Sequence, residues 1–277
     1  MDDYVRRQNK LHECHVLLLE EVKRICKKHG LQYFAIAGTL LGAVRHQGAI
    51  PWDDDMDLGM LREEYDKFLE AAGSELDCRF FLQNIDTDPG YGLNFSKLLL
   101  RDTVMIERNS ADNSACKGIY IDIFPLDNAP DDVRLREKQD KSTYFLKRLL
   151  LAKQGYKVYD SHDTKKKLAY GILWAMAAFS SKERICARLE AAIQKYNAAP
   201  TQMIVNVGGA YGYRKEMLRR DWFHGSVELP FENTTISAPA EYAAYLTYFY
   251  GDYMTPPPEN KRGDRHSILL LDFGPYQ

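Results

Sequence analysis

A glycine-containing turn between a buried strand and a short helix is the feature that most limits how this chain can fold. The apolar run at 33–37 predicts a buried strand, which Gly38 and Thr39 interrupt. The next segment, 40–46, has the length and composition of a short helix that Thr39 would cap. Because the first N–H groups of a helix have no acceptor within it, this unit predicts an anion-binding turn.

Two aspartates separated by one residue follow the turn and would bind a cation, whereas the turn would bind an anion. Asp55 and Asp57 alternate with Met56 and Leu58, so on an extended strand both carboxylates project from one face. Two adjacent carboxylates repel each other unless a cation lies between them, and hard oxygen ligands suit Mg2+ or Mn2+. Turn and aspartates together predict a site for a metal-bound phosphate.

Three other aspartates are less clear from the pattern alone. Asp53 and Asp54 are predicted to lie in a solvated loop, as most acidic runs do. Asp122 sits inside an apolar segment, 118–124, that predicts a strand. A buried charge needs a partner, so Asp122 either faces the same cation or lies on an edge strand facing water. Both alternatives stay open here.

The remaining pattern indicates a sheet-bearing first half and a helical second half, of α/β or α+β class. We expect helices at 4–28, 62–72 and over most of the locally basic 130–197, and a partly irregular tail from 248. The expected strands are 80–83, 95–100, 118–124 ended by Pro125, 203–207 and 227–229.

Composition excludes several classes of protein. The 277 residues are 45% hydrophobic and 27% charged, which rules out disordered or fibrous chains. Lys and Arg total 37 against 39 Asp and Glu, so no global basic field points to nucleic acid. Five scattered cysteines without a Cys-x-x-Cys pair predict reduced thiols. The absence of a signal-peptide pattern and of an apolar run of ~20 residues leads us to expect a cytoplasmic protein.

Three ordered blocks of this sequence closely resemble the signature of the LicD family of phosphocholine transferases. That family is related to fukutin and fukutin-related protein and belongs to the nucleotidyltransferase-fold superfamily. The blocks are AGTLLGAVRHQGAIPWDDDMD at 37–57, GIYIDIFPLD at 118–127 and YFYGDYMTPPP at 248–258, whereas 130–197 matches poorly.

The resemblance implies an α+β fold, with a nucleotidyltransferase-like mixed sheet flanked by helices and a helical insertion. We expect a catalytic core at 1–129, an acceptor- or membrane-proximal insertion at 130–200 and a C-terminal part at 201–277 that completes the core and the substrate site. The family pattern places Mg2+ (or Mn2+) on Asp55, Asp57 and Asp122, against donor phosphates at Gly38 and Thr39.

Further candidates rest on weaker signals. Lys97 lies amid leucines on the strand at 95–100, an odd position unless it meets an anion, so a phosphate contact is one expectation for it. Arg45 at the end of the short helix, and Arg262 and His266 after the prolines, are candidate phosphate contacts, with a solvated basic surface as the alternative. For the quaternary ammonium of choline, Trp52 is the expected aromatic partner by its position.

The segment 165–180 begins with three lysines and continues with an apolar run. An apolar run of ~10–14 residues is either a packed core helix or an interfacial one, so a peripheral contact with the inner face of the membrane is a hypothesis.

The expected function is Mg2+-dependent transfer of phosphocholine, or a similar phospho-alcohol, from CDP-choline or a related donor. The acceptor is a hydroxyl of a cell-surface glycan or glycolipid precursor, such as teichoic acid or lipopolysaccharide. Asp122 would either complete the metal site or take the acceptor's proton. Two alternatives remain: a nucleotidyltransferase acting on a small molecule, and a non-catalytic glycan- or nucleotide-binding protein.

Overall fold

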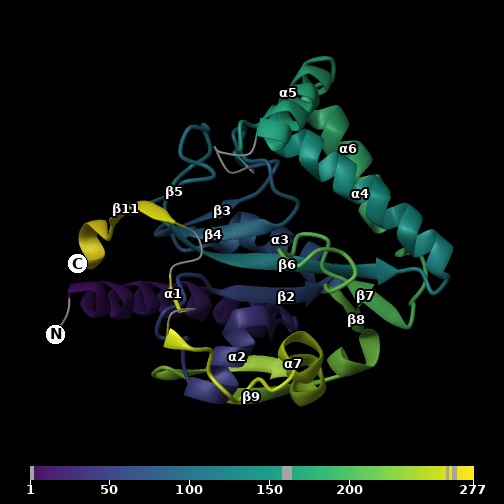
Figure 1. Cartoon of the computed structure of the whole chain (residues 1–277). Helices are drawn as coiled ribbons and strands as arrows, with labels where there is room; N and C mark the ends of the chain where they lie inside the picture. Colours follow the sequence, from purple (N-terminus) through teal and green to yellow (C-terminus); the bar gives the residue numbers. More distant parts are fainter. Residues whose placement is uncertain (1–2, 158–163, 260–261, 264–266) are drawn as a thin grey trace.

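The computed structural model describes residues 3–157, 164–259, 262–263 and 267–277 (Figure 1). The helices over these ranges are α1 (Asp3–His29), α2 (Ala37–His46), α3 (Arg62–Glu75), α4 (Val133–Lys153), α5 (Thr164–Ala178), α6 (Lys182–Ile193) and α7 (Tyr242–Tyr250). Short 3-10 helices lie at Gln194–Tyr196, Arg220–Phe223 and Gly274–Tyr276. The strands are β1 (Phe34–Ala35), β2 (Asp57–Leu61), β3 (Phe80–Gln83), β4 (Ser96–Leu100), β5 (Val104–Glu107), β6 (Ile119–Ala129), β7 (Met203–Val205), β8 (Met217–Arg219), β9 (Ser226–Phe231), β10 (Thr234–Pro239) and β11 (Ile268–Asp272).

A mixed sheet forms the centre of the molecule. Within the described residues it has seven strands, in the order β1-β2-β6-β4-β3, with β7 on β6 and β8 on β7. The pair β2–β6 is parallel, and the other neighbours are antiparallel. Every residue of β6 is buried, as expected of a strand with a neighbour along most of its length.

Strand β6 passes through Pro125 instead of ending there, so the predicted end of this strand was wrong. Asp122 donates its backbone N–H to the carbonyl of Met56, on the β2 side. Because the amides of a strand alternate in direction, the nitrogen of Pro125 faces the β4 side. The pairing with β4 ends at Ile123, so the proline removes no hydrogen bond of the sheet.

Helix α1 covers one face of the sheet. Its apolar side chains are buried against that face, with Leu11, Leu18, Val22 and Ile25 all at 0% exposure. The helix contacts β4 and β6, and β6 turns alternate residues toward this core. The opposite face of the same strands is therefore left for the candidate site.

The second-half helices form a separate layer with a core of their own. Helices α4 and α6 lie side by side in both views, and their buried residues pack with Ala129 and Val205 at the end of the sheet. The expectation of a mostly helical 130–197 is confirmed over its described part. The division at residues 129 and 200 stays a prediction.

The C-terminal tail is more regular than its sequence predicts. It includes the end of α7, and β11, which pairs with β5 as a separate two-stranded sheet. Strands β5, β8 and β10 were not predicted either, because short strands of this kind are defined by partners distant in sequence. The α+β class is confirmed. Across the described ranges, none of the helices combines the length and the apolar character needed to cross a bilayer.

Candidate active site

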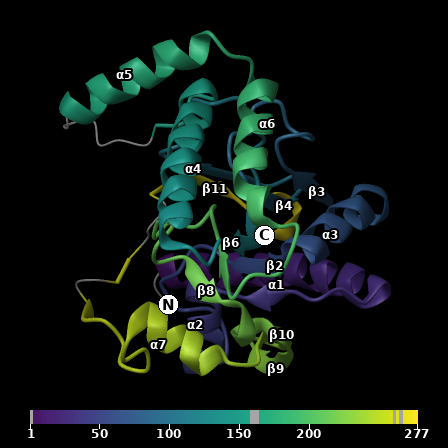
Figure 2. The same cartoon turned by 90° about the vertical axis from the view of Figure 1, so that its right-hand side faces the viewer.

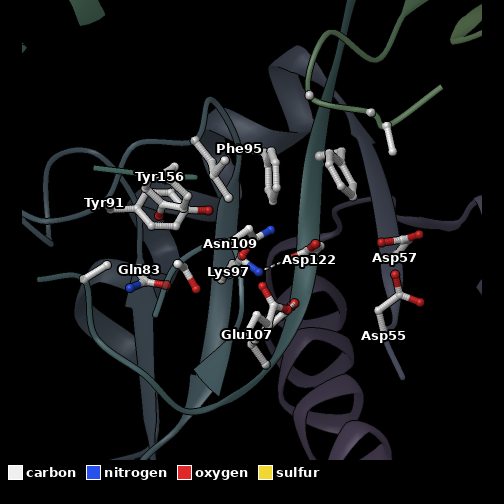
Figure 3. Close-up of a pocket in the computed structure, with 18 of the residues that line it drawn as sticks. Asp55, Asp57, Gln83, Tyr91, Phe95, Lys97, Glu107, Asn109, Asp122 and Tyr156 are labelled. Carbon is white, nitrogen blue, oxygen red and sulfur yellow. Dashed lines mark hydrogen bonds and ion pairs between the residues drawn. The ribbon is translucent and has the colours of Figure 1, made fainter. Parts of the chain in front are cut away.

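One line of side chains crosses four strands on the face opposite α1. Strand register places Asp57 of β2 beside Asp122 of β6, Asp122 beside Lys97 of β4, and Lys97 beside Gln83 of β3. Residues that pair across strands project from the same face, and all four line one cavity. Figure 3 shows Asp57 and Asp122 adjacent, with Asp55 next to Asp57. The sheet thus gathers the three predicted carboxylates.

The predicted turn lies at this site but works differently from the expectation. Helix α2 begins at Ala37, so Gly38 and Thr39 lie in its first turn, and Thr39 is not the N-cap residue. Its hydroxyl instead accepts a hydrogen bond from the backbone N–H of Asp57 at 2.7 Å. A Cβ on Gly38 would come within 2.5 Å of an oxygen of Asp53, which explains the glycine. Both residues fix the acidic segment against the helix N-terminus.

The first residue of α2 borders the cavity in a strained conformation. Ala37 has φ +47°, in the left-handed region that residues other than glycine seldom occupy. Its N–H donates to the hydroxyl of the buried Tyr245 at 3.0 Å. This hydrogen bond to α7 holds Ala37 in that conformation, so the C-terminal part of the sequence supports the site directly.

Lys97 meets an anion, as its burial among leucines required, and that anion is a carboxylate of the site. Its Nζ lies 3.2 Å from Oδ1 of Asp122 and 3.1 Å from the centre of the Tyr120 ring. Burial raises the pKa of Asp122 to about 6, with the charges of Asp55 and Glu107 acting the same way and Lys97 opposing them. The edge-strand alternative for Asp122 is therefore wrong. A phosphate contact for Lys97 stays a prediction.

The cavity continues from the carboxylates to an aromatic end, and its volume is about 380 Å³. Tyr91 and Tyr156 lie together there, with Phe95 between them and the aspartates (Figure 3). The Tyr91 hydroxyl is buried and has no hydrogen-bond partner among the described residues. Neither tyrosine was singled out from sequence, because Tyr91 follows a Pro-Gly turn and Tyr156 comes from the end of the insertion helix α4.

Two further carboxylates line the cavity that sequence analysis missed. Glu107 of β5 accepts a hydrogen bond from the Tyr120 hydroxyl. Glu216 lies under the glycine turn that contains Gly209, and it accepts a hydrogen bond from the N–H of Tyr211 at 3.2 Å. Burial raises the pKa of Glu216 to about 7. With Asp55, Asp57 and Asp122, five carboxylates line a cavity that has two lysines, Lys97 and Lys117.

The donor set fits a hard divalent cation. Carboxylate oxygens are the protein ligands that Mg2+ and Mn2+ prefer, and the strong mutual repulsion in this cavity would be relieved by a dication. Asp53, Asp54 and Asp55 also bring carboxylate oxygens within 4.8 Å of one another. Asp54 is only 1% exposed, so the predicted solvated loop is wrong at that residue.

The structure places the other predicted residues outside this cavity. Arg262 lies over the Trp52 ring at 4.7 Å, and His46 meets the same ring edge-on. Arg45 donates to the carbonyl of Tyr253 at 3.1 Å, and burial followed by the charge of Arg262 lowers its pKa. Arg45, Trp52 and Arg262 therefore form a group at the end of α2, away from the cavity lining. His266 lies outside the described residues. The roles of all four stay predictions.

Comparison with known proteins agrees with this geometry. Residues 30–150 match the family described as LicD/FKTN/FKRP, nucleotidyltransferase domain, and this range contains Asp55, Asp57, Lys97 and Asp122. Residues 30–150 are thus similar to the nucleotidyltransferase domain of the LicD family. The match extends past the predicted boundary at residue 129 into α4.

Individual relatives cover very different shares of this chain. It is 26% identical over 259 residues to the lipopolysaccharide cholinephosphotransferase LicD of Haemophilus influenzae, which is 90% of this chain and 92% of that protein. It is 36% identical over 66 residues to the human ribitol 5-phosphate transferase FKRP, covering 22% of this chain and 13% of that protein. An uncharacterised Rickettsia prowazekii protein is 47% identical over 47 residues, or 17% and 18% of the two chains. The expected resemblance to the LicD family is confirmed, and the two relatives of named activity are phosphotransferases.

Proposed function

We propose that this protein transfers phosphocholine from CDP-choline to a hydroxyl of a glycan or glycolipid precursor, with Mg2+ or Mn2+ as cofactor. The observation that carries the proposal is similarity to a lipopolysaccharide cholinephosphotransferase over 90% of the chain. The shorter match to a ribitol 5-phosphate transferase supports phospho-alcohol transfer more generally. The line of charged residues at the cavity supports the same chemistry.

In the proposed reaction the acceptor oxygen forms a bond to the phosphorus that carries choline. The bond between that phosphorus and the bridging oxygen of the diphosphate breaks, and CMP leaves with the electron pair. Asp55, Asp57 and Asp122 would hold the cation, which supplies charge neutralisation on the diphosphate. Lys97 would add positive charge at the same edge, and a carboxylate of the site would take the acceptor's proton.

The choline group would fit the aromatic end of the cavity better than the predicted Trp52. A quaternary ammonium binds against aromatic faces, and Tyr91, Phe95 and Tyr156 line the same cavity as the aspartates. A face of Trp52 is instead taken by Arg262, a cation that would repel choline. The acidic lining of the cavity also favours a cationic alcohol, because its carboxylates attract positive charge.

A donor assay tests the proposal directly. The purified chain is incubated with Mg2+ and, in separate reactions, CDP-choline, CDP-ribitol or a nucleoside triphosphate, together with a hydroxyl acceptor. Release of CMP from CDP-choline with a phosphocholine-bearing product is expected. If CMP is released only from CDP-ribitol, the transferred group is ribitol phosphate instead of phosphocholine, and the proposed reaction class is unchanged. Release of pyrophosphate would support the nucleotidyltransferase alternative, and lack of Mg2+-dependent donor binding in calorimetry would support a non-catalytic protein.

A further inference from the structure

Helix α5 presents an apolar face to solvent. Its large side chains are highly exposed: Leu168 at 70%, Ile172 at 55% and Trp174 at 62%, with Phe179 just after the helix at 89%. Leu168, Ile172 and Phe179 follow one another at helical spacing, so they lie on one side of the helix. A contiguous apolar face of this size on a folded chain marks a contact surface.

The opposite side of α5 supplies its attachment to the molecule. Ala177 is the one buried residue along the described helix, and its carbonyl accepts a hydrogen bond from Lys153 of α4 at 3.2 Å. The hydroxyl of Tyr170 donates to the carbonyl of Tyr156 at 2.6 Å. Figure 2 shows α5 at the edge of the molecule, reaching away from the central sheet. The packed-helix alternative from the sequence therefore holds on the side of α5 that meets α4, whereas the outer face is exposed.

Positive charges outnumber negative ones around this face. No residue from 168 to 181 is charged, and three lysines, 165–167, precede this run. Arg148 and Lys166 line a groove between α4 and α5, together with Tyr144 and Phe145. Over residues 130–200 the sequence has 15 Lys and Arg against 8 Asp and Glu, whereas the rest of the chain has 22 against 31. Positive charge is thus concentrated in the segment that carries the apolar face.

We propose that the outer face of α5 docks on the surface of an anionic lipid bilayer. An apolar helix face flanked by lysines binds such a surface by burying its side chains at the headgroup boundary while the lysines meet lipid phosphates. A second copy of the chain is a poorer occupant, because a symmetric contact would bring the two lysine clusters together. Tyr156, which lines the active-site cavity, also holds α5, so docking would place that cavity near lipid-linked molecules.

Vesicle binding of the full chain tests this proposal without any substrate, so its outcome is separate from that of the proposed function. Co-sedimentation is measured at low salt with phosphatidylglycerol-containing vesicles and with pure phosphatidylcholine vesicles. We expect binding to the anionic vesicles at least tenfold stronger than to the neutral ones, and weaker binding at 0.5 M salt.

Matched variants separate the apolar and electrostatic parts. Ile172→Glu with Phe179→Glu, and separately Lys165→Glu with Lys167→Glu, should each reduce binding at least tenfold. The controls are Val133→Glu, at an exposed apolar residue at the far end of α4, and Arg6→Glu with Arg7→Glu on α1. These changes alter neither the apolar face nor the lysines of α5. Equal loss in the controls, or no binding by the wild-type chain, would overturn the proposal. So would a lipid-free dimer that Ile172→Glu with Phe179→Glu converts to a monomer.

Discussion

Lys97 and Asp122 face each other across β4 and β6, and their charged atoms lie 3.2 Å apart at the centre of the cavity. The register of the sheet creates this pair, because Asp122 is flanked by Lys97 on one side and by Asp57 on the other. A buried carboxylate therefore has one cationic and one anionic neighbour. Such an arrangement is stable when positive charge balances the acidic side, which is where the proposed cation would bind.

Lys97→Met should make the protein more dependent on Mg2+. Removing the ammonium leaves more unbalanced negative charge in the cavity, so the metal-free variant should lose about 1–3 kcal/mol of stability. Mg2+ should then raise the melting temperature more than it does for the wild type. Lys117→Met is the control, because Lys117 lines the same cavity but its Nζ donates to Asn113. Equal Mg2+ shifts in Lys97→Met and the wild type would contradict a shared site.

Asp57→Asn should abolish transfer while leaving the fold intact, because Asp57 lies at the cavity edge, half-buried, and the amide keeps its size. Mn2+ binding, followed by electron paramagnetic resonance or calorimetry, should fall at least tenfold. Asp53→Asn distinguishes the alternative cluster of Asp53, Asp54 and Asp55. If Asp53→Asn loses Mn2+ and Asp57→Asn retains it, the cation binds at that cluster and our ligand assignment is wrong.

Tyr156→Leu should weaken recognition of the choline group. The loss of one cation–π contact of about 0.5–2 kcal/mol raises KM for CDP-choline up to roughly thirtyfold. The KM for a donor with an uncharged alcohol, such as CDP-ribitol, should change much less. Trp52→Leu serves as the comparison, since the sequence favoured Trp52 but the structure places Arg262 on its ring. A selective effect of Trp52→Leu, with none from Tyr156→Leu, would restore the original assignment.

The sequence identified the site more fully than its surroundings. Asp55 and Asp57 were singled out by local alternation, since strand geometry alone decides which side chains share a face. Lys97 was singled out because a lysine among leucines is an odd residue to bury. The capping role predicted for Thr39 was wrong, because its hydroxyl accepts from the amide of Asp57 on β2, a partner 18 residues away. Its phosphate contact stays a prediction. Asp122 remained ambiguous because the position of β6 between β2 and β4 depends on contacts that no local pattern specifies.

Residues missed entirely come from elements defined by distant partners. Glu107 lies on β5, which exists as a strand through its pairing with the C-terminal β11. Glu216 reaches the cavity because Gly209, which has no Cβ, leaves space for its side chain. Neither glutamate can be assigned to the cavity from the sequence alone, because its position depends on contacts that form only in the folded chain.

Arg62→Met should strongly destabilise the protein, because Arg62 connects the core to the insertion. Its guanidinium donates twice to the buried Asp127 of β6 at 2.8 Å and lies 3.0 Å from Glu190 of α6. Burial opposes the charge, yet the hydrogen bonds that Arg62 donates to Asp127 raise the pKa of Arg62.

Without Arg62, Asp127 is left buried with reduced compensation, at a cost of about 3–5 kcal/mol in urea unfolding. Arg62→Met with Asp127→Asn should recover part of this loss. Lys67→Met, which removes an exposed ion pair with Glu64, should cost less than about 1 kcal/mol. A loss of that small size for Arg62→Met would show that the buried pair does not hold the two layers together.

Glu216→Gln should change how stability depends on pH. Burial raises the pKa of Glu216 in the folded chain to about 7 from 4.5, so between these values the folded state binds more protons than the unfolded state. The contribution of this carboxyl to stability is fully present below pH 4.5 and is lost as pH rises to 7. Glutamine does not titrate, so as pH rises through this window the variant should become more stable relative to the wild type, by at most about 3 kcal/mol.

Urea unfolding at pH 5 and pH 7.5 measures this change in stability, and Glu137→Gln, at an exposed carboxyl of α4, is the control. A constant difference between Glu216→Gln and the wild type at the two pH values would mean that Glu216 is not held in the neutral form.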